Sequence, residues 1–173
     1  MAIGAATVGF IVTVGLYSGL TRTPAPVDVV RVQGPAPDFS LPYVGDTSVS
    51  FRLSGLIRGR PAVLNFFGAW CPPCRQELPL LAGAARSSGR RVAFVGVDLE
   101  DQLGPARRLL ATAGVSYPAG FDPDDKVANL YRLGGTPTTV FIDTRGRVVG
   151  KVDGELSRAR LDWWLARIIP SGR

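Results

Sequence analysis

The chain has 173 residues, which suits one domain with a hydrophobic core but leaves no room for a second once an apolar start and a linker are set aside. Its net charge of +6 comes from 18 arginines and two lysines that are spread along the sequence among acidic residues, so no basic cluster indicates a nucleic-acid partner. The chain has no histidine and only two cysteines, which excludes Ser-His and Cys-His catalysis and any zinc-histidine or four-cysteine metal site built from one chain.

The N-terminal segment predicts a membrane anchor. Residues 2–20 carry no charged side chain, and a helix of that length, at about 1.5 Å per residue, would span about 28 Å, close to the thickness of a bilayer's hydrocarbon core. A cleaved signal peptide is the alternative, but its apolar region is usually shorter and Ser18-Gly19-Leu20-Thr21 is a poor cleavage site. We therefore expect residues 1–21 to form an uncleaved anchor.

The charges around this segment conflict with a domain outside the cytoplasm. The positive-inside rule places Lys and Arg on the cytoplasmic side, yet none precedes the segment, whereas Arg22 and Arg31 follow it. Taken alone, that asymmetry would put the following domain in the cytoplasm. Proline-rich stretches at 23–26 and 34–37 predict a semi-rigid linker over residues 22–36, followed by a domain over residues 37–173.

The first half of this domain predicts a hairpin and a βαβ unit. Residues 39–41 and 49–53 are weak strands on either side of Gly45-Asp46, a turn signal. Residues 62–67 and 92–97 are short apolar runs with little alternation, as expected of strands buried on both faces of a sheet. A helical stretch that includes Glu77 lies between these two runs.

The second half predicts helices and one further hairpin. We expect helices over about 105–113, which Gly114 would stop, and over about 124–131. Strands at 138–142 and 147–152 are joined by a polar turn. A final amphipathic helix over 157–169 would bury one apolar stripe: Leu161, Trp164, Leu165 and Ile168. The element order predicts an α/β fold with a mixed central sheet, flanking helices and an N-terminal hairpin extension.

Cys71 and Cys74 have the spacing of a redox pair. On a helix, side chains three residues apart lie about 5–6 Å apart at Cβ, within small adjustment of a disulfide. Pro72 suits the first helical position, which would place Cys71 at the helix N-terminus, where free N–H groups favour the thiolate. We therefore expect Cys71 to be the exposed nucleophile and Cys74 to be the resolving thiol. An inert disulfide and half of a zinc site shared between two chains are the alternatives.

The segment Val63-Leu64-Asn65-Phe66-Phe67-Gly68-Ala69-Trp70-Cys71-Pro72-Pro73-Cys74-Arg75-Gln76-Glu77-Leu78-Pro79 resembles the active-site segment of the TlpA/ResA/DsbE-like thioredoxin family. Two further segments support the resemblance: Pro37-Asp38-Phe39-Ser40-Leu41 is similar to the family's opening hairpin, and Gly134-Gly135-Thr136-Pro137-Thr138 to its cis-proline loop. The resemblance implies a thioredoxin-like fold and a membrane-anchored protein that reduces disulfides outside the cytoplasm, often in cytochrome c maturation. It implies no cofactor beyond the Cys71–Cys74 disulfide.

The resemblance also implies roles for residues around the pair. Thr136-Pro137 would face the cysteines in a cis-proline turn, and Trp70, Pro72 and Pro73 would contact the substrate. Glu77 would tune the thiol pKa values and shuttle protons. A solvated helix charge is the alternative for Glu77, simple packing for Trp70 and an ordinary turn for Pro137.

Asn65 stands where many thioredoxins carry a buried aspartate, and because an amide cannot exchange protons in that role, Glu77 is the better candidate for proton transfer.

The function expected is thiol-disulfide exchange with protein substrates, in the reducing direction, with re-reduction by a membrane thiol-electron donor. The same residues could serve in the oxidising direction, because direction depends on the reduction potential relative to the compartment. A non-catalytic adaptor of the same fold is the other alternative. A peroxiredoxin would need a threonine three residues before its peroxidatic cysteine, a position that Gly68 occupies.

Overall fold

The computed structural model describes residues 34–99 and 102–170. The expected anchor and most of the expected linker therefore lie outside the described residues. None of the helices in the described ranges is long and apolar enough to cross a membrane. Gly34 and Pro35, which the sequence analysis assigns to the linker, already form a strand of the sheet.

The domain is a six-stranded mixed sheet in the order β1-β8-β7-β4-β5-β6, with a separate two-stranded hairpin β2-β3. β4 runs parallel to β5 and antiparallel to β7. The strands are β1 (Gly34–Pro35), β2 (Ser40–Pro42), β3 (Ser50–Arg52), β4 (Ala62–Phe67), β5 (Ala93–Leu99), β6 (Ala119–Asp122), β7 (Thr138–Ile142) and β8 (Arg147–Asp153). The predicted mixed sheet and N-terminal hairpin are thus confirmed.

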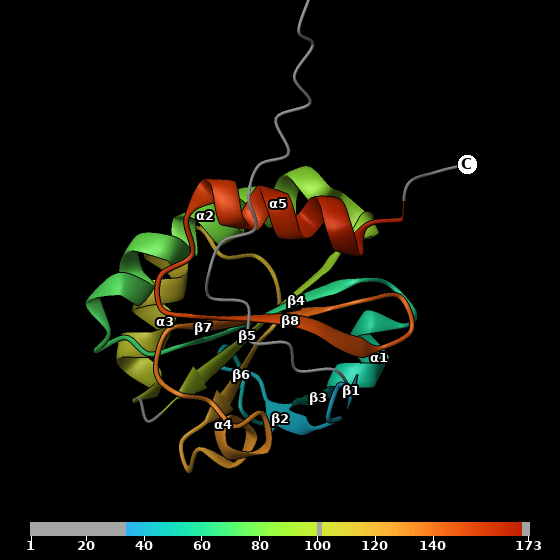
Figure 1. The fold of residues 1–173 in the computed structure, drawn as a ribbon. Helices are drawn as coiled ribbons and strands as arrows, with labels where there is room; N and C mark the ends of the chain where they lie inside the picture. The colour runs from blue at the N-terminus through green and yellow to red at the C-terminus, as the bar shows by residue number, and fades with distance from the viewer. Residues whose placement is uncertain (1–33, 100–101, 171–173) are drawn as a thin grey trace, which may run out of the picture.

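Helices cover both faces of this sheet (Figure 1). α2 and α5 lie on one face, and α1, α4 and the β2-β3 hairpin lie on the other. The helices are α1 (Leu53–Ile57), α2 (Pro72–Ser88), α3 (Leu103–Thr112), α4 (Lys126–Leu130) and α5 (Arg158–Ile168), with a short 3-10 turn at Gly89–Arg91. The ends of α3, α4 and α5 differ by one or two residues from those predicted, which is the usual uncertainty of a fraying helix end.

The central strand β4 alternates its side chains between two cores. Val63 packs with the apolar residues of α2 and α5 on one face, while Leu64 and Phe66 pack on the opposite face with the hairpin and α4. Because successive side chains of a strand point to opposite faces, Asn65 lies on the same face as Val63, beneath α2. This alternation carries a polar side chain to the helix that bears the cysteines.

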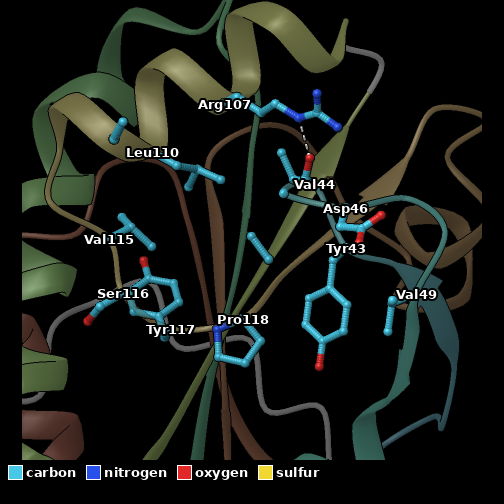
Figure 2. Close-up of a pocket in the computed structure, with 13 residues that line it drawn as sticks. Tyr43, Val44, Asp46, Val49, Arg107, Leu110, Val115, Ser116, Tyr117 and Pro118 are labelled. Atoms are coloured by element: carbon cyan, nitrogen blue, oxygen red, sulfur yellow. Dashed lines mark hydrogen bonds between the residues drawn. The ribbon is translucent and has the colours of Figure 1, made fainter.

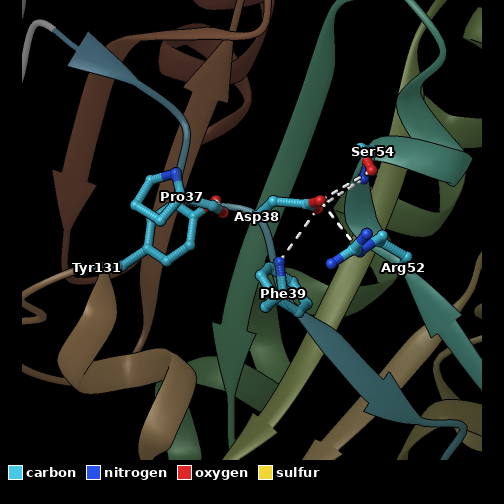
Figure 3. A network of polar contacts seen from close by, with 6 residues as sticks. All are labelled: Pro37, Asp38, Phe39, Arg52, Ser54 and Tyr131. Atoms are coloured by element: carbon cyan, nitrogen blue, oxygen red, sulfur yellow. Dashed lines mark hydrogen bonds and ion pairs between the residues drawn. The ribbon is translucent and has the colours of Figure 1, made fainter.

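The start of the domain is fixed by Asp38 (Figure 3). Its carboxylate accepts hydrogen bonds from the backbone N–H and the hydroxyl of Ser54 at 3.0 and 2.9 Å and lies 3.2 Å from Arg52 Nε. Burial alone would raise the pKa of Asp38, but the Ser54 bonds, Arg52 and the Phe39 N–H together hold it below its usual range. One residue earlier, Pro37 accepts a 2.7 Å hydrogen bond from the hydroxyl of Tyr131.

The far edge of the sheet is covered by the segment after β2. Tyr43 forms an isolated antiparallel bridge with Gly120 of β6, and a Cβ on Gly120 would lie 2.8–2.9 Å from Leu41 and Phe51. A groove of about 740 Å³ opens between this segment and α3, where Arg107 Nε donates to the Val44 carbonyl at 2.7 Å (Figure 2). None of the residues expected for the redox site lines this groove.

Candidate redox site

The two cysteines form a disulfide at the start of α2. Cys71 is the N-cap residue with an extended backbone, Pro72 is the first helical residue, and the two Cα atoms lie 5.3 Å apart. The Cys74 N–H donates to Cys71 Sγ at 3.2 Å. The predicted placement of Cys71 at a helix N-terminus is therefore confirmed, and a main-chain donor already points at the sulfur that would carry a thiolate.

The expectation of an exposed Cys71 is wrong for this disulfide state. The exposed fraction of Cys71 is 2%, and Cys74 is fully buried among Phe67, Leu78 and residues of α3. Cys71 packs in one cluster with Cys74, Phe67 and Leu78, which the spacing of the two cysteines alone does not reveal. The exposed residues at this point are Trp70 and Pro72, while Pro73 is half-buried.

Glu77 lies one turn beyond Cys74 and is buried, with an exposed fraction of 1%. Its Oε1 accepts a 2.7 Å hydrogen bond from Asn65 Nδ2, and its Oε2 accepts a 2.8 Å bond from the Leu156 N–H. Asn65 also donates to Thr139 Oγ1 at 3.1 Å, across the β4-β7 pair. These contacts exclude the alternative of a solvated helix charge for Glu77.

Burial is the main reason why the pKa of Glu77 is raised from 4.5 to about 7. The hydrogen bonds from Leu156 and Asn65 favour the carboxylate and oppose this shift, while the charge of Glu155 adds to it. A carboxyl with a pKa near 7 changes its protonation state close to neutral pH. It therefore has the proton affinity that acid-base exchange with a neighbouring thiol requires.

The indole of Trp70 lies against Gly68, in the loop that precedes the cysteines. Its indole N–H donates to the Leu99 carbonyl at 3.2 Å, and half of the side chain is exposed, 50% of its surface. A Cβ on Gly68 would lie 2.5 Å from the indole Nε1 and 2.7 Å from Cε2, so a threonine at that position would collide with the ring. Gly68 thus allows the tryptophan to occupy the place above the loop.

The Thr136-Pro137 peptide is cis, as the sequence analysis expects. The next residue, Thr138, pairs with Phe66, so Pro137 lies at the level of Phe67, four residues before Cys71. Thr136 and Trp70 line one pocket of about 240 Å³ together with residues of α4 and the loop after it. The fold therefore brings two of the expected substrate-contacting segments to a shared surface.

Several side chains around the site are missing from the sequence analysis. Arg75 Nε donates to the Ala69 carbonyl at 2.8 Å and so supports the loop between β4 and the first cysteine. Lys151 is a buried lysine next to an exposed aspartate, Asp153. The signal that could have found Lys151 is its position as the one charged residue in the interior of a strand whose other charges lie at its two ends. Across residues 34–99 and 102–170, no three Cys, Asp or Glu side chains gather in a way that could hold a metal ion.

Comparison with known proteins gives a match to the AhpC/TSA family over residues 32–151. The chain is 31% identical over 145 residues to the thiol-disulfide oxidoreductase ResA of Oceanobacillus iheyensis, an alignment that covers 82% of this chain and 75% of that protein. It is 33% identical over 146 residues to the thiol:disulfide interchange protein DsbE of Allochromatium vinosum, covering 82% of this chain and 79% of that protein.

Among solved structures, a thiol:disulfide interchange protein of the thioredoxin family from Chlorobium tepidum superposes with a TM-score of 0.71 at 30% identity. The superposition covers 80% of this chain and 97% of that one. The sheet and helices described above are therefore a thioredoxin-like fold, as the resemblance of the active-site segment implies.

Proposed function

This chain belongs to the AhpC/TSA family and, like ResA and DsbE, is a thiol-disulfide oxidoreductase with Cys71–Cys74 as its redox-active disulfide, and from this premise we propose that it reduces protein disulfides outside the cytoplasm. The single observation that supports this most is the placement of the disulfide: its outer sulfur caps α2, and the cis-proline loop shares a pocket with Trp70, the residue directly before Cys71. In the proposed cycle the Cys71 thiolate attacks a substrate disulfide, and Cys74 then resolves the mixed disulfide.

Glu77 favours the reducing direction. Strong disulfide oxidants owe their potential to a stabilised thiolate in the reduced form. A buried carboxyl three residues after Cys74 has the opposite effect when it is ionised, because a nearby negative charge disfavours the thiolate. The measurement is the reduction potential of the Cys71–Cys74 couple against glutathione. A potential near −120 mV, about that of a strong oxidant, would support the disulfide-forming alternative instead.

The substrate class we propose is apocytochrome c, in its Cys-x-x-Cys-His haem-attachment segment. The proposal rests on the resemblance to ResA and DsbE and on the pocket that Trp70 and Thr136 share beside the redox pair. The test is to express Cys74→Ser and to look for proteins held on Cys71 in mixed disulfides. The matched control is Cys71→Ser, which leaves the inner thiol alone.

Trapping by Cys74→Ser but not by Cys71→Ser is the expected result, and mass spectrometry of the trapped species identifies the substrate. Trapped proteins without a Cys-x-x-Cys-His segment would contradict the cytochrome part of the proposal. Full function of Cys71→Ser in cells would favour the non-catalytic adaptor over the oxidoreductase cycle.

We further propose that residues 2–20 anchor the protein and that a membrane thiol-electron donor re-reduces it. The length and lack of charge of this segment support an anchor, whereas Arg22 and Arg31 oppose an extracytoplasmic domain. Alkaline phosphatase fused after Arg173 decides between the two orientations, because it is active only outside the cytoplasm. An inactive fusion that is made in normal amounts would place the domain inside.

A further inference from the structure

A buried lysine supports the sheet behind the cis-proline loop. Lys151 has an exposed fraction of 6% and pairs with Val140, while Asp153 pairs with Thr138. Because side chains two apart on a strand share a face, Lys151, Asp153 and Thr138 all lie on the face of the sheet that α4 covers. Burying an ammonium group is costly unless its hydrogen bonds are made, so its contacts indicate what it does.

The Lys151 ammonium joins both ends of the loop over residues 132–138. At the start of the loop, Nζ donates to the Arg132 carbonyl at 2.9 Å. At its end, Nζ lies 3.4 Å from Asp153 Oδ1, which also accepts a 2.9 Å bond from the Thr138 hydroxyl. Thr138 Oγ1 further lies 2.8 Å from the Gly135 carbonyl, inside the loop.

Gly154, the residue after Asp153, contacts Pro137, the residue before Thr138. The Gly154 N–H donates to the Pro137 carbonyl at 2.8 Å. Pro137 is thus held through the backbone of Gly154, and the next residue, Thr138, through the side chain of Asp153. The loop is anchored at three points of its length to β8 and the residue that follows it.

Leu133 packs the loop against the core, but the first residue of the loop, Arg132, borders a cavity. A cavity of about 420 Å³ lies between the start of the domain, the end of α4 and the β7-β8 sheet face. Its walls include Leu130, Tyr131, Arg132, Val140, Val148 and Lys151. At Arg132 the loop therefore has a cavity beside it in place of close-packed atoms, and the hydrogen bond from Lys151 supplies a constraint that packing does not supply at that point.

We propose that Lys151 and Asp153 are positioning residues that hold the cis-proline loop in place for the docking of a disulfide-bearing chain. The loop presents Thr136 in one pocket with Trp70, which directly precedes Cys71, and an incoming chain that pairs with the backbone edge of the loop needs that edge fixed before the sulfur atoms meet. A small disulfide, which makes no such backbone contacts, does not need it. The proposal rests on the thiol-disulfide exchange activity and not on the identity of the substrate.

The first test is amide hydrogen exchange of the full chain carrying Lys151→Met, which removes the ammonium and keeps a long apolar side chain. Lys126→Met is the matched control, because Lys126 is the other lysine and forms an exposed ion pair with Asp124 at 2.8 Å. We expect amides of residues 132–138 to exchange about tenfold faster in Lys151→Met and at the wild-type rate in Lys126→Met. Unchanged exchange in the loop of a folded Lys151→Met would overturn the proposal.

The second test compares two disulfides as oxidants of the reduced protein: 2-hydroxyethyl disulfide and a twelve-residue peptide closed by one Cys-x-x-Cys disulfide. In each reaction the oxidant's disulfide is reduced while Cys71 and Cys74 form theirs. For Lys151→Met we expect the KM for the peptide to rise about fivefold to tenfold. The limiting rate with the peptide and the rate with the small disulfide should stay within about twofold of wild type.

Equal losses with both oxidants would indicate damage to the redox pair itself and would overturn the positioning role. If the reduced wild-type protein does not react with the peptide disulfide, that result counts against the proposed substrate class. Hydrogen exchange then decides the proposal about Lys151 and Asp153. If Lys151→Met does not fold, Asp153→Asn replaces it, since Asp153 is partly exposed. In Asp153→Asn we expect the amides of the loop to exchange at least threefold faster than in wild type. Exchange of these amides at the wild-type rate would overturn the proposal.

Discussion

Asn65 and Glu77 are joined by a 2.7 Å hydrogen bond between the central strand and the helix that carries the cysteines. The bond uses an amide donor and a carboxylate acceptor, so it favours the ionised form of Glu77, yet burial outweighs it and leaves the pKa of Glu77 raised to about 7. The amide at position 65 therefore sets the orientation of the acid without competing for its proton.

Replacing Glu77 by glutamine should change how stability depends on pH. In the folded protein the pKa of Glu77 is about 7 instead of 4.5, so the stability it contributes is complete below pH 4.5 and is lost as the pH rises through 7. The loss at pH 8 is about 3 kcal/mol. Urea unfolding of the oxidised protein from pH 4 to 8 should show a decline of this size in wild type and none of it in Glu77→Gln.

Asp162→Asn is the control for this measurement, because Asp162 is an exposed carboxylate in a surface ion pair with Arg158. The free energy of unfolding of Asp162→Asn should decline with rising pH as that of the wild type does. A Glu77→Gln variant with the wild-type pH dependence would show that some other group titrates.

The same substitution should remove an inflection from the pH-rate profile. If Glu77 exchanges protons with the neighbouring thiol, the rate of disulfide exchange in wild type changes slope near pH 7, where the carboxyl ionises. We expect Glu77→Gln to keep the inflection of the attacking thiol and to lose the one near 7. Stopped-flow rates of the reduced protein with 2-hydroxyethyl disulfide between pH 5 and 9 measure this. A profile unchanged by the substitution would contradict a proton-transfer role.

A methyl group on Gly68 should displace the tryptophan above the loop. A Cβ there would lie 2.5 Å from Trp70 Nε1, and the half-exposed indole can escape only by breaking its hydrogen bond to the Leu99 carbonyl. Gly68→Ala is therefore expected to lose about 1 kcal/mol of stability and to shift tryptophan emission to the red. When Trp70 is already replaced by alanine, Gly68→Ala should cause almost no further loss of stability.

Gly83→Ala is the matched control for that variant. Gly83 lies within α2, and a Cβ there meets no atom within 4 Å, so the substitution should stabilise the protein by about 0.5–1 kcal/mol. Additive losses from Gly68→Ala and Trp70→Ala would argue against the steric coupling.

Removing the carboxylate of Asp38 should loosen the start of the domain. Asp38→Ala loses two hydrogen bonds from Ser54 and should cost about 1–3 kcal/mol at pH 7, whereas Arg52→Ala removes only an exposed ion pair and should cost less than about 1 kcal/mol. The pKa of Asp38 is lowered from 3.8, so its contribution is present above pH 3.8 and is lost as the pH falls through the lower, folded-state value. Unfolding at pH 7 and at successively lower pH measures this, and a loss that does not shrink as the pH falls below 3.8 would contradict it.

The helices and strands that could be predicted are those whose own residues show a recognisable pattern of apolar side chains or a helix-start residue. The apolar runs of β4 and β5 predict strands from their own residues, and Pro72 directly after Cys71 predicts the start of α2. α1 and β6 have only five and four residues and contain Gly55 and Gly120, so neither shows a period long enough to detect. β6 is formed by its pairing with β5, and α1 directly follows the last strand of the hairpin.

The residues of the site divide in the same way. The cysteine spacing and the cis-proline loop are local features of the sequence, whereas the burial of Cys71, the bond between Asn65 and Glu77 and the position of Lys151 depend on partners far away in the chain. Leu156, which donates to Glu77, is 79 residues from it. Such pairings follow from how strands and helices are layered, and a single sequence does not reveal that arrangement.

The donor that points at Cys71 Sγ is the N–H of Cys74, and it belongs to the main chain. Since every residue except proline brings the same N–H, no substitution of a side chain can remove this donor while the second cysteine remains. A substitution that is meant to change the reduction potential therefore has to act through side chains around this donor, such as the two prolines between the cysteines or the carboxyl of Glu77, while the donor itself stays in place.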